Sequence, residues 1–407
     1  MKKYIAIFFA FCSSTLLFGQ GGSNYSIFGI GDVYQINGAA YEGLAGTSTA
    51  IENEHAINLK NPALWSYIKS TRLQAGFRFN HHTNVRDNFN NAQTNSKVDG
   101  VLSIFNIDTS LGFSVSLGFY PYSSINYMIA NPIKVTIDSS EIHGETNYTG
   151  QGGLSIAYIG GAIKPFNKLS LGASIYAILG SSQQLIQTNI FQTNTFQSAD
   201  KKNDNYLGFG IKGGIYFKPF DNFSLGAYFE NNQFVNVNRT TIFSSYLLGD
   251  TSYTSSFEMN LPNAYGIGIA YRTGKFLIGV DYSYQDFNNF CYQNSPNVKF
   301  KNLSSYSIGL SRIGSKLAGA EFADKISYNF GFGYKQLYYN VQGIDINEIF
   351  ASIGVEVPLI GGSIIDAAYS LGIRGTTENS LIKEFFGRLT IDISIGEIWF
   401  KPFSVDY

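Results

Sequence analysis

The sequence predicts an all-β membrane protein: a 14-stranded antiparallel transmembrane β-barrel with an N-terminal hatch inside its lumen. Three observations predict this fold. The chain opens with an export signal, it combines many aromatic residues and glycines with few charges, and apolar and polar residues alternate over most of its length. Strands of a membrane barrel show such alternation because one face meets lipid and the other faces the lumen.

Residues 1–19 have the pattern of a secretory signal peptide. Lys2 and Lys3 form a basic start, residues 4–11 are apolar, and small and polar residues follow. The apolar stretch is too short to span a membrane, and we expect cleavage after Gly19. Only Cys291 remains in the mature chain, so the sequence excludes an intrachain disulfide.

The composition of the mature chain excludes two classes of protein. Removing the signal leaves 26 basic and 29 acidic residues, a charge of −3, which is too balanced for a nucleic-acid partner. No mature stretch offers about 18 consecutive apolar residues, so a helical membrane protein is excluded. Charged residues are 14% of the chain, against about 25% in soluble domains. These features favour a barrel in the outer membrane of a Gram-negative cell, in contact with membrane lipid.

Residues 20–70 do not alternate and are rich in Gly, Ala, Ser and Thr. This segment has no core of its own, and a 14-stranded barrel leaks unless something fills it. We therefore expect residues 20–70 to form the hatch, with Gly43 and Gly46 at points that have no room for a side chain. Asn61, Pro62 and Ala63 predict a stiff corner before the first strand. The corner taken alone also fits any loop that precedes a strand.

Residues 71–407 are expected to form the barrel. Residues 264–272, 275–285 and 388–396 alternate most clearly, with one apolar or aromatic face and one small or polar face. A soluble β-sandwich also alternates, but Lys, Glu and Thr would then dominate the polar face, which here is rich in Gly, Ser and Ala. The predicted strands are 72–80, 98–106, 111–137, 145–164, 168–180, 206–218, 222–235, 255–273, 275–287, 300–313, 325–337, 347–358, 363–375 and 385–397.

The connections between these strands are of two kinds. Short turns at 164–168, 218–222, 272–275 and 358–362, with a longer turn at 314–324, are expected on the periplasmic side. Long polar segments at 81–97, 181–205, 236–254 and 287–300 are expected to be external loops. The third strand, 111–137, is too long for one plain strand. We predict an interruption from Gly118 through Pro121 and Tyr122, because proline cannot donate a ladder hydrogen bond.

Charged residues of both signs fall on the predicted lumen face. One interpretation is a salt-bridged network that holds the hatch, since unpaired charges in a narrow lumen are costly. The alternative is an arginine cluster that binds a ligand carboxylate. The residues concerned are Arg72, Arg78, Lys212, Arg272, Asp281, Arg374, Arg388 and Asp392, together with Glu230, Glu356 and Asp366.

The sequence contains no constellation typical of an enzyme. Residues 208–213, GFGIKG, match a dinucleotide-binding pattern but lie within a strand and do not open a helix. His81 and His82 have no metal ligands at the usual spacing, and no serine lies in a nucleophile elbow. We therefore expect no catalytic residues, no metal and no cofactor. The aromatic C-terminus, with Trp399, Phe403 and Tyr407, fits recognition by the barrel-assembly machinery.

Several segments together resemble the FadL/TodX family of outer-membrane channels for hydrophobic compounds. They are AAYEGLAGTSTAI (39–51), Asn61-Pro62-Ala63, LPNAYGIGIAYRTGKFLIGVDYSY (261–284), and KPFNKLSLGA (164–173) with its echo KPFDNFSLGA (218–227). The resemblance implies a hatch, a lateral opening in the third strand, and passive uptake of long-chain fatty acids or hydrocarbons through a lumen pocket.

An alternative function remains open within the same family. Some relatives do not transport, and such a barrel would be a structural or protein-secretion accessory that binds a secretion-system protein. The polar segments 181–205 and 236–254 favour the accessory function, because lipid-capturing relatives have apolar loops there. The break at Pro121 favours uptake of a hydrophobic small-molecule ligand.

Overall fold

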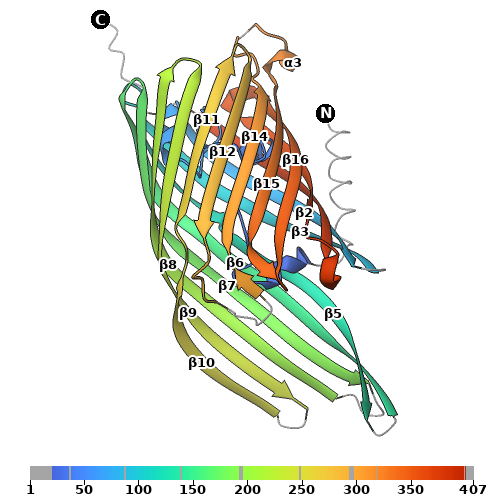
Figure 1. The fold of residues 1–407 in the computed structure, drawn as a ribbon. Helices are drawn as coiled ribbons and strands as arrows, with labels where there is room; N and C mark the ends of the chain where they lie inside the picture. Colours follow the sequence, from blue (N-terminus) through green and yellow to red (C-terminus); the bar gives the residue numbers. More distant parts are fainter. Residues whose placement is uncertain are drawn as a thin grey trace, which may run out of the picture.

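The structure is a computed structural model that describes residues 21–35, 38–86, 89–137, 140–191, 196–246, 249–292, 298–317, 319–397 and 399. The expected signal peptide, Phe403 and Tyr407 lie outside these ranges. Antiparallel pairing runs from strand to strand around a ring that closes where β18 pairs with β2 (Figure 1). The predicted class is confirmed: the chain is all-β, and its wall is a closed 14-stranded antiparallel barrel.

Three of the wall strands are each interrupted once. Each of these three strands therefore carries two consecutive labels. These are β4 with β5, β10 with β11, and β13 with β14, each pair facing the same neighbouring strand. In chain order the wall consists of β2 (Thr71–Arg86), β3 (Phe89–Asp108), β4 (Phe113–Pro121), β5 (Ser123–Ile137), β6 (Ser140–Phe166), β7 (Leu169–Phe191), β8 (Phe196–Phe220), β9 (Phe223–Ser245), β10 (Gly249–Asn260), β11 (Ala264–Thr273), β12 (Phe276–Asp286), β13 (Val298–Phe300), β14 (Asn302–Arg312), β15 (Ser327–Val341), β16 (Ile344–Pro358), β17 (Ile364–Arg374) and β18 (Lys383–Glu397).

The outer face of the wall is apolar, as the alternation predicted. Ile175, Ile267 and Ile393 point outward with 63%, 61% and 47% of their surface exposed, while Asp281 and Asp392 on the inner face are buried. Large apolar side chains are exposed in this way on most strands. A continuous apolar exterior of this size is stable only against lipid. The barrel therefore spans a membrane, and barrels of this kind belong to outer membranes.

The prediction was wrong about most of the long loops. Residues 81–86, 181–191, 196–205, 236–245 and 249–254 are strand, and they extend β2, β7, β8, β9 and β10 into long hairpins. Figure 1 shows β5 to β10 continuing far beyond the ends of β14 to β16. Outside lipid both faces of a hairpin meet water, so polar residues on both faces removed the alternation that would have identified these strands.

Short helices occupy the interior and the turns. Three of them, η2 (Asn24–Ile27), α2 (Ala39–Glu42) and η3 (Pro62–Tyr67), belong to the N-terminal part of the chain, as does the two-residue strand β1 (Asp32–Val33). The others, α3 (Phe322–Lys325), η4 (Ile360–Gly362) and η5 (Glu378–Ser380), lie in turns. None of the helices in the described ranges is long and apolar enough to cross a membrane.

The described residues from 21 to 70, here called the N-terminal segment, lie inside the barrel. Ile30, Ala39, Ile57 and Trp65 of this segment are at most 2% exposed. Its blue ribbon runs between the walls in Figure 1. Because the inner face of the wall carries small and polar side chains, the backbone of the segment can approach it closely and exchange hydrogen bonds with it.

The wall has a seam, defined here as residues 90–100 of β3 facing residues 123–137 of β5. Pairing between β3 and β4 ends at Val101 and Phe119. Beyond that point the described residues of β3 pair with β2, and those of β5 pair with β6 and, at Ser123 and Ser124, with β1. The predicted interruption of the third strand thus coincides with the start of the seam.

Candidate functional site

Helix α2 is anchored to the wall by charged side chains. Glu42 is fully buried, 3.0 Å from Arg388 and 3.6 Å from Arg78. Burial alone would raise the pKa of Glu42, but the two guanidinium groups outweigh it and hold the pKa below its ordinary value. At the other end of the helix, Asp99 and Asp392 accept the free backbone N–H groups of residues 38 and 39, at 2.9 and 2.7 Å.

The turn after α2 is bound by a carboxylate of β12. Oδ2 of Asp281 accepts the backbone N–H groups of Ser48 and Thr49 at 2.8 and 2.9 Å, and the Thr49 hydroxyl at 2.6 Å. Lys60 Nζ lies 3.9 Å from the same oxygen. A carboxylate that accepts several donors at once is strongly tied to its partner, so Asp281 fixes this turn against the wall.

The two glycines singled out in the sequence are constrained for different reasons. A Cβ on Gly43 would lie 2.9 Å from the backbone of Gly354 on β16, so α2 and the wall meet glycine against glycine. Gly46 adopts a φ of +83°, a conformation that other residues rarely adopt. Close approach to the wall therefore constrains Gly43, and the turn conformation constrains Gly46.

The corner Asn61-Pro62-Ala63 begins helix η3 and contacts the wall strand β8. The Asn61 side chain accepts the Ala63 N–H at 3.1 Å and donates to the carbonyls of Thr49 and Ile215, at 2.8 and 3.0 Å. Pro62 occupies the first helical position, where the absence of an N–H costs nothing. The corner therefore connects two parts of the N-terminal segment, at Thr49 and Asn61, and holds both against β8.

We predict that Asn61→Ala lowers the free energy of unfolding by on the order of 2–3 kcal/mol, because it removes three hydrogen bonds of one buried side chain, to Thr49, Ala63 and Ile215. Urea unfolding in lipid vesicles, followed by the fluorescence of the buried Trp65 four residues away, would measure the loss. Asn90→Ala, at an exposed position on β3, is the matched control and should change little. An Asn61→Ala protein as stable as the parent would show that these contacts contribute nothing.

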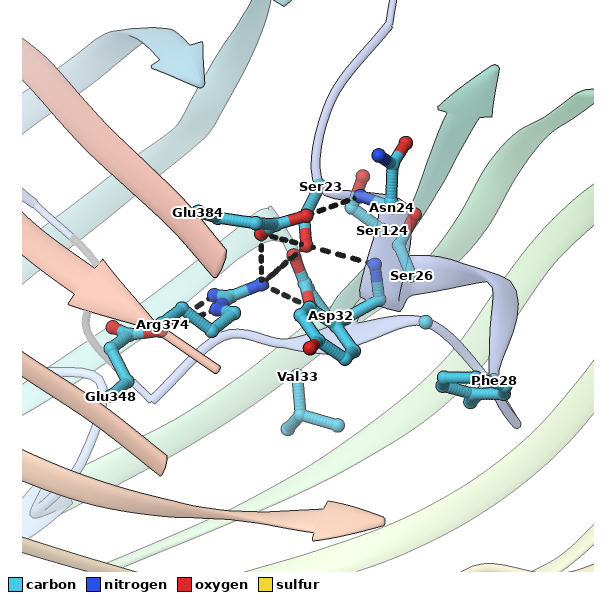
Figure 2. A network of polar contacts seen from close by, with 12 residues as sticks. Ser23, Asn24, Ser26, Phe28, Asp32, Val33, Ser124, Glu348, Arg374 and Glu384 are labelled. Atoms are coloured by element: carbon cyan, nitrogen blue, oxygen red, sulfur yellow. Dashed lines mark hydrogen bonds and ion pairs between the residues drawn. The ribbon is translucent and has the colours of Figure 1, made fainter. Parts of the chain in front are cut away.

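Arg374 holds the start of the N-terminal segment to the wall (Figure 2). Its Nε and Nη2 donate to Glu348 at 2.9 and 2.6 Å, and its Nη1 lies 2.9 Å from both carboxylate oxygens of Asp32. Nη1 also donates to Ser23 Oγ at 2.7 Å and lies 3.8 Å from Glu384. One buried guanidinium thus connects β16, β17 and β18 with two points of the N-terminal segment.

Three further basic residues predicted on the lumen face lie in different environments. Lys212 pairs with Glu230 at 2.8 Å and donates to the Leu59 carbonyl of the N-terminal segment at 3.0 Å. Arg72 is buried and donates to Ser394 Oγ and a turn carbonyl, at 2.9 and 3.0 Å. Arg272 is exposed at the short-turn end, away from this network.

Protein groups already surround the buried arginines. Arg78 lies 2.9 Å from Asp99, Arg374 lies between Glu348 and Asp32, and Arg388 contacts Glu42. This arrangement fits the first interpretation, a network that holds the interior segment. A carboxylate ligand would have to displace an acidic side chain to bind the same guanidinium groups.

The N-terminal segment also occupies the seam. The backbone N–H of Gly22 donates to the Asn126 carbonyl at 3.0 Å, and the Asn126 N–H donates to Ser26 Oγ at 3.0 Å. Val33 pairs with Ser123, the first residue of β5. These contacts supply partners to the edge of β5, whose backbone groups would otherwise face the seam unpaired.

The three residues predicted to interrupt the third strand lie at the start of the seam but differ in role. Gly118 remains paired with Leu102 on one side and Tyr158 on the other, so it is not part of the break. Pro121 pairs with β6 alone. Tyr122 lies between β4 and β5, and its carbonyl accepts the Tyr34 N–H of the N-terminal segment at 2.8 Å.

The interior offers little open space. Two cavities beside the N-terminal segment measure about 60 and 40 Å³ and are lined by charged side chains, including Lys60, Lys212 and Glu230 in the first and Arg78 and Arg374 in the second. Pockets for small molecules usually measure about 300–1,000 Å³ and are mostly apolar. A larger hollow of about 490 Å³ opens at the short-turn end, lined in part by residues 52–55.

Aromatic side chains fill the lumen towards the long hairpins. The rings of Phe287 and Tyr338 stack with centroids 4.3 Å apart, and Phe290 and Phe300 meet edge to face at 5.1 Å. Phe28 of the N-terminal segment packs 5.4 Å from Tyr339, which belongs to the same cluster. The N-terminal segment and the wall therefore close this end of the lumen together.

The sequence did not identify several residues of this network. Glu42, Asp99, Glu348 and Glu384 all contact a lumen arginine. Glu384 lies an even number of positions from Arg388 and Asp392 on β18, so all three point to the same face. Extending the alternation of residues 388–396 towards the N-terminus therefore predicts Glu384 on the lumen face. Asp99 is different, because an irregularity in the pairing of β2 with β3 sets its inward direction, and no alternation reveals that. Among the described residues, no group of three or more His, Cys, Asp or Glu side chains could hold a metal ion.

This combination defines a class: a 14-stranded transmembrane barrel with its N-terminal segment folded inside and an interruption in the third wall strand. Comparison with known proteins gives the family. A family model described as BamG matches residues 1–404, and the chain belongs to the BamG family. No curated protein sequence matches the chain.

Solved structures of the same fold include transport channels. The Pseudomonas putida toluene transporter TodX is 14% identical, with a TM-score of 0.60, and the match covers 90% of this chain and 100% of that one. The Ralstonia pickettii toluene transporter TbuX is 12% identical, with a TM-score of 0.59 and coverage of 89% and 98%. A Pseudomonas aeruginosa FadL homologue is 11% identical, with a TM-score of 0.61 and coverage of 89% and 98%. The predicted resemblance is confirmed at the level of the fold.

Proposed function

We propose that this chain is a closed FadL-type barrel of the outer membrane that acts as an accessory in protein export or barrel assembly. The observation that carries the proposal is the filled lumen. The N-terminal segment acts as a hatch held by Glu42, Asp281 and Arg374. Two of the cavities beside it measure only about 60 and 40 Å³, and the larger hollow of about 490 Å³ lies at the short-turn end. Partners would be a secretion-system protein or the barrel-assembly machinery, bound through the long hairpins.

Passive uptake of small hydrophobic molecules is the second candidate function. The fold likeness to toluene transporters supports it, and so does the seam, where wall pairing stops after Val101 and Phe119. For uptake, the N-terminal segment would have to leave the seam so that a hydrocarbon or fatty acid could pass sideways into the bilayer. A sideways route would spare the ligand about 0.8 kcal/mol for each CH₂ kept from water.

Two measurements on the intact protein separate the candidates. Proteoliposomes containing the barrel should take up labelled toluene and labelled fatty acid no faster than empty liposomes. Depleting the chain in cells should lower the amounts of other exported proteins in the outer membrane, while the permeability to the two labelled compounds stays the same. Saturable uptake by the proteoliposomes, with no change in exported proteins on depletion, would overturn the accessory proposal in favour of transport.

A further inference from the structure

One edge of the long-hairpin sheet is open. Strand β10 pairs with β9 along its whole length, from Gly249 to Asn260. Among the described residues, the residue-by-residue pairing joins β10 to β9 alone, because β1 pairs with β5, and β11 pairs with β9 and β12. Residues 249–256 are exposed on both faces, and β10 continues beyond the part of the wall where β11 joins β12. The outer edge of β10 therefore presents a row of unpaired backbone N–H and C=O groups.

The opposite edge of the same sheet is protected. There β5 pairs with β6 alone beyond Asn126, but it carries Pro132 and Lys134. Lys134 lies 3.5 Å from Glu141 on β6. A proline and a charged side chain are two common devices that prevent further strand pairing. Residues 251–257 of β10, TSYTSSF, contain neither device.

The two faces of β10 differ. Tyr253 and Phe257 lie on the same face of β10 as the buried Met259. On this face the ring of Tyr253 stacks 6.2 Å from that of Phe243, and Arg239 lies 5.0 Å from the ring of Phe257. The outer face carries Ser and Thr side chains. Two acidic residues, Asp250 and Glu258, mark the two ends of that face and are eight positions apart.

We propose that the edge of β10 binds an extended segment of a partner protein by strand addition. The segment has uncharged β-forming residues in its middle and a Lys or Arg opposite each of Asp250 and Glu258. Strand addition would satisfy the free backbone groups, and the two acidic residues would set the register. The inference deepens the accessory function proposed above and rests on it for its cellular role.

A second copy of the chain fits this edge poorly. Two β10 edges related by a two-fold axis would pair antiparallel about Thr254. Asp250 of one copy would then face Glu258 of the other at both ends of the pair. Like charges directly opposite each other destabilise strand pairing, so the acidic residues oppose self-association and favour a basic partner.

A nine-residue labelled peptide, with lysine at both ends and alternating valine, threonine and tyrosine between, is the probe. It should bind the full-length barrel in detergent saturably, as measured by fluorescence anisotropy. A peptide with glutamate at both ends should bind about tenfold more weakly. The double variant Asp250→Lys with Glu258→Lys should reverse this preference, whereas Glu141→Lys, near the protected edge, should leave it unchanged.

Proline substitution tests the backbone contribution. Neighbouring N–H groups of a strand point to opposite sides, so one of Thr254→Pro and Ser255→Pro removes a donor from the open edge. That variant should lose peptide binding while keeping the heat-modifiable mobility of a folded barrel. Absence of binding to the parent protein, an unchanged charge preference in the double variant, or a Thr254→Cys disulfide dimer formed in membranes would overturn the proposal. Peptide binding without any effect of depletion on exported proteins would contradict only the accessory function.

Discussion

Replacing Arg374 with methionine should detach the start of the N-terminal segment and lower the free energy of unfolding by about 3–5 kcal/mol. The guanidinium lies among three carboxylates, those of Asp32, Glu348 and Glu384, and it is 3% exposed. Removing it leaves three acidic groups close together with no opposing charge from this side chain. Breaking one side of a buried ion pair costs much more than the pair contributes, because the remaining charge has lost its solvation.

Two readouts would distinguish local detachment from general loss of stability. Urea unfolding in vesicles gives the free energy, and limited proteolysis followed by N-terminal sequencing shows whether residues 21–34 have become accessible. Arg312→Met is the matched control: its side chain is 31% exposed and pairs with the exposed Asp324 at 3.3 Å, so its loss should cost less than about 1 kcal/mol. An Arg374→Met protein with the parent's stability and cleavage pattern would mean that the segment is held elsewhere.

The double variant Arg374→Met with Glu348→Gln gives a further check. Since Glu348 accepts two of the guanidinium hydrogen bonds, neutralising it removes one of the uncompensated charges. The double variant should recover part of the lost stability relative to Arg374→Met alone. A further loss would indicate that Glu348 contributes through packing and not through its charge.

The wall of the barrel could be predicted from the sequence because lipid imposes a rule on each strand. An apolar residue must point outward at every second position, so Ile267, Ile269 and Tyr271 identified both a strand and its orientation. The short turns followed from Pro and Gly, and together they gave the number of wall strands. Beyond the lipid this rule no longer applies, so the polar segments predict loops where the structure has long hairpins.

The interior was less predictable because its contacts are distant in the sequence. The sequence placed Arg374 in the lumen, but Asp32 is 342 residues away and nothing local links the two. The segment 20–70 was expected inside because it had no core of its own, yet its path through the seam depends on hydrogen bonds to Asn126 and Tyr122. Alternation identifies the face on which a side chain lies but does not identify its partner.

Deleting residues 21–34 should convert a closed barrel into a conducting one. The variant retains the signal peptide and all residues from 35 onward. The edge of β5 would lose its partners at Ser123 and Ser124. Lys335 and Tyr338 would lose the carbonyl acceptors of Val33 and Gly31, now at 2.9 and 2.7 Å. The seam would then lose its backbone partners and keep side-chain bridges such as that from Gln93 to the Met128 carbonyl at 3.0 Å. Glu42 and Asp281 would still hold the rest of the N-terminal segment.

Single-channel recording in planar bilayers measures the change. The parent should give a closed baseline, and the deletion variant should give stable open steps at each insertion. A variant in which residues 21–34 are replaced by glycine and serine, equal in length but without Asp32, is the matched control for chain length and should also conduct. A closed baseline in the deletion variant would show that residues 38–70 seal the lumen without help. Uptake of labelled toluene by the deletion variant alone would identify residues 21–34 as the barrier in the seam, because the parent barrel has the same wall and differs only in that segment.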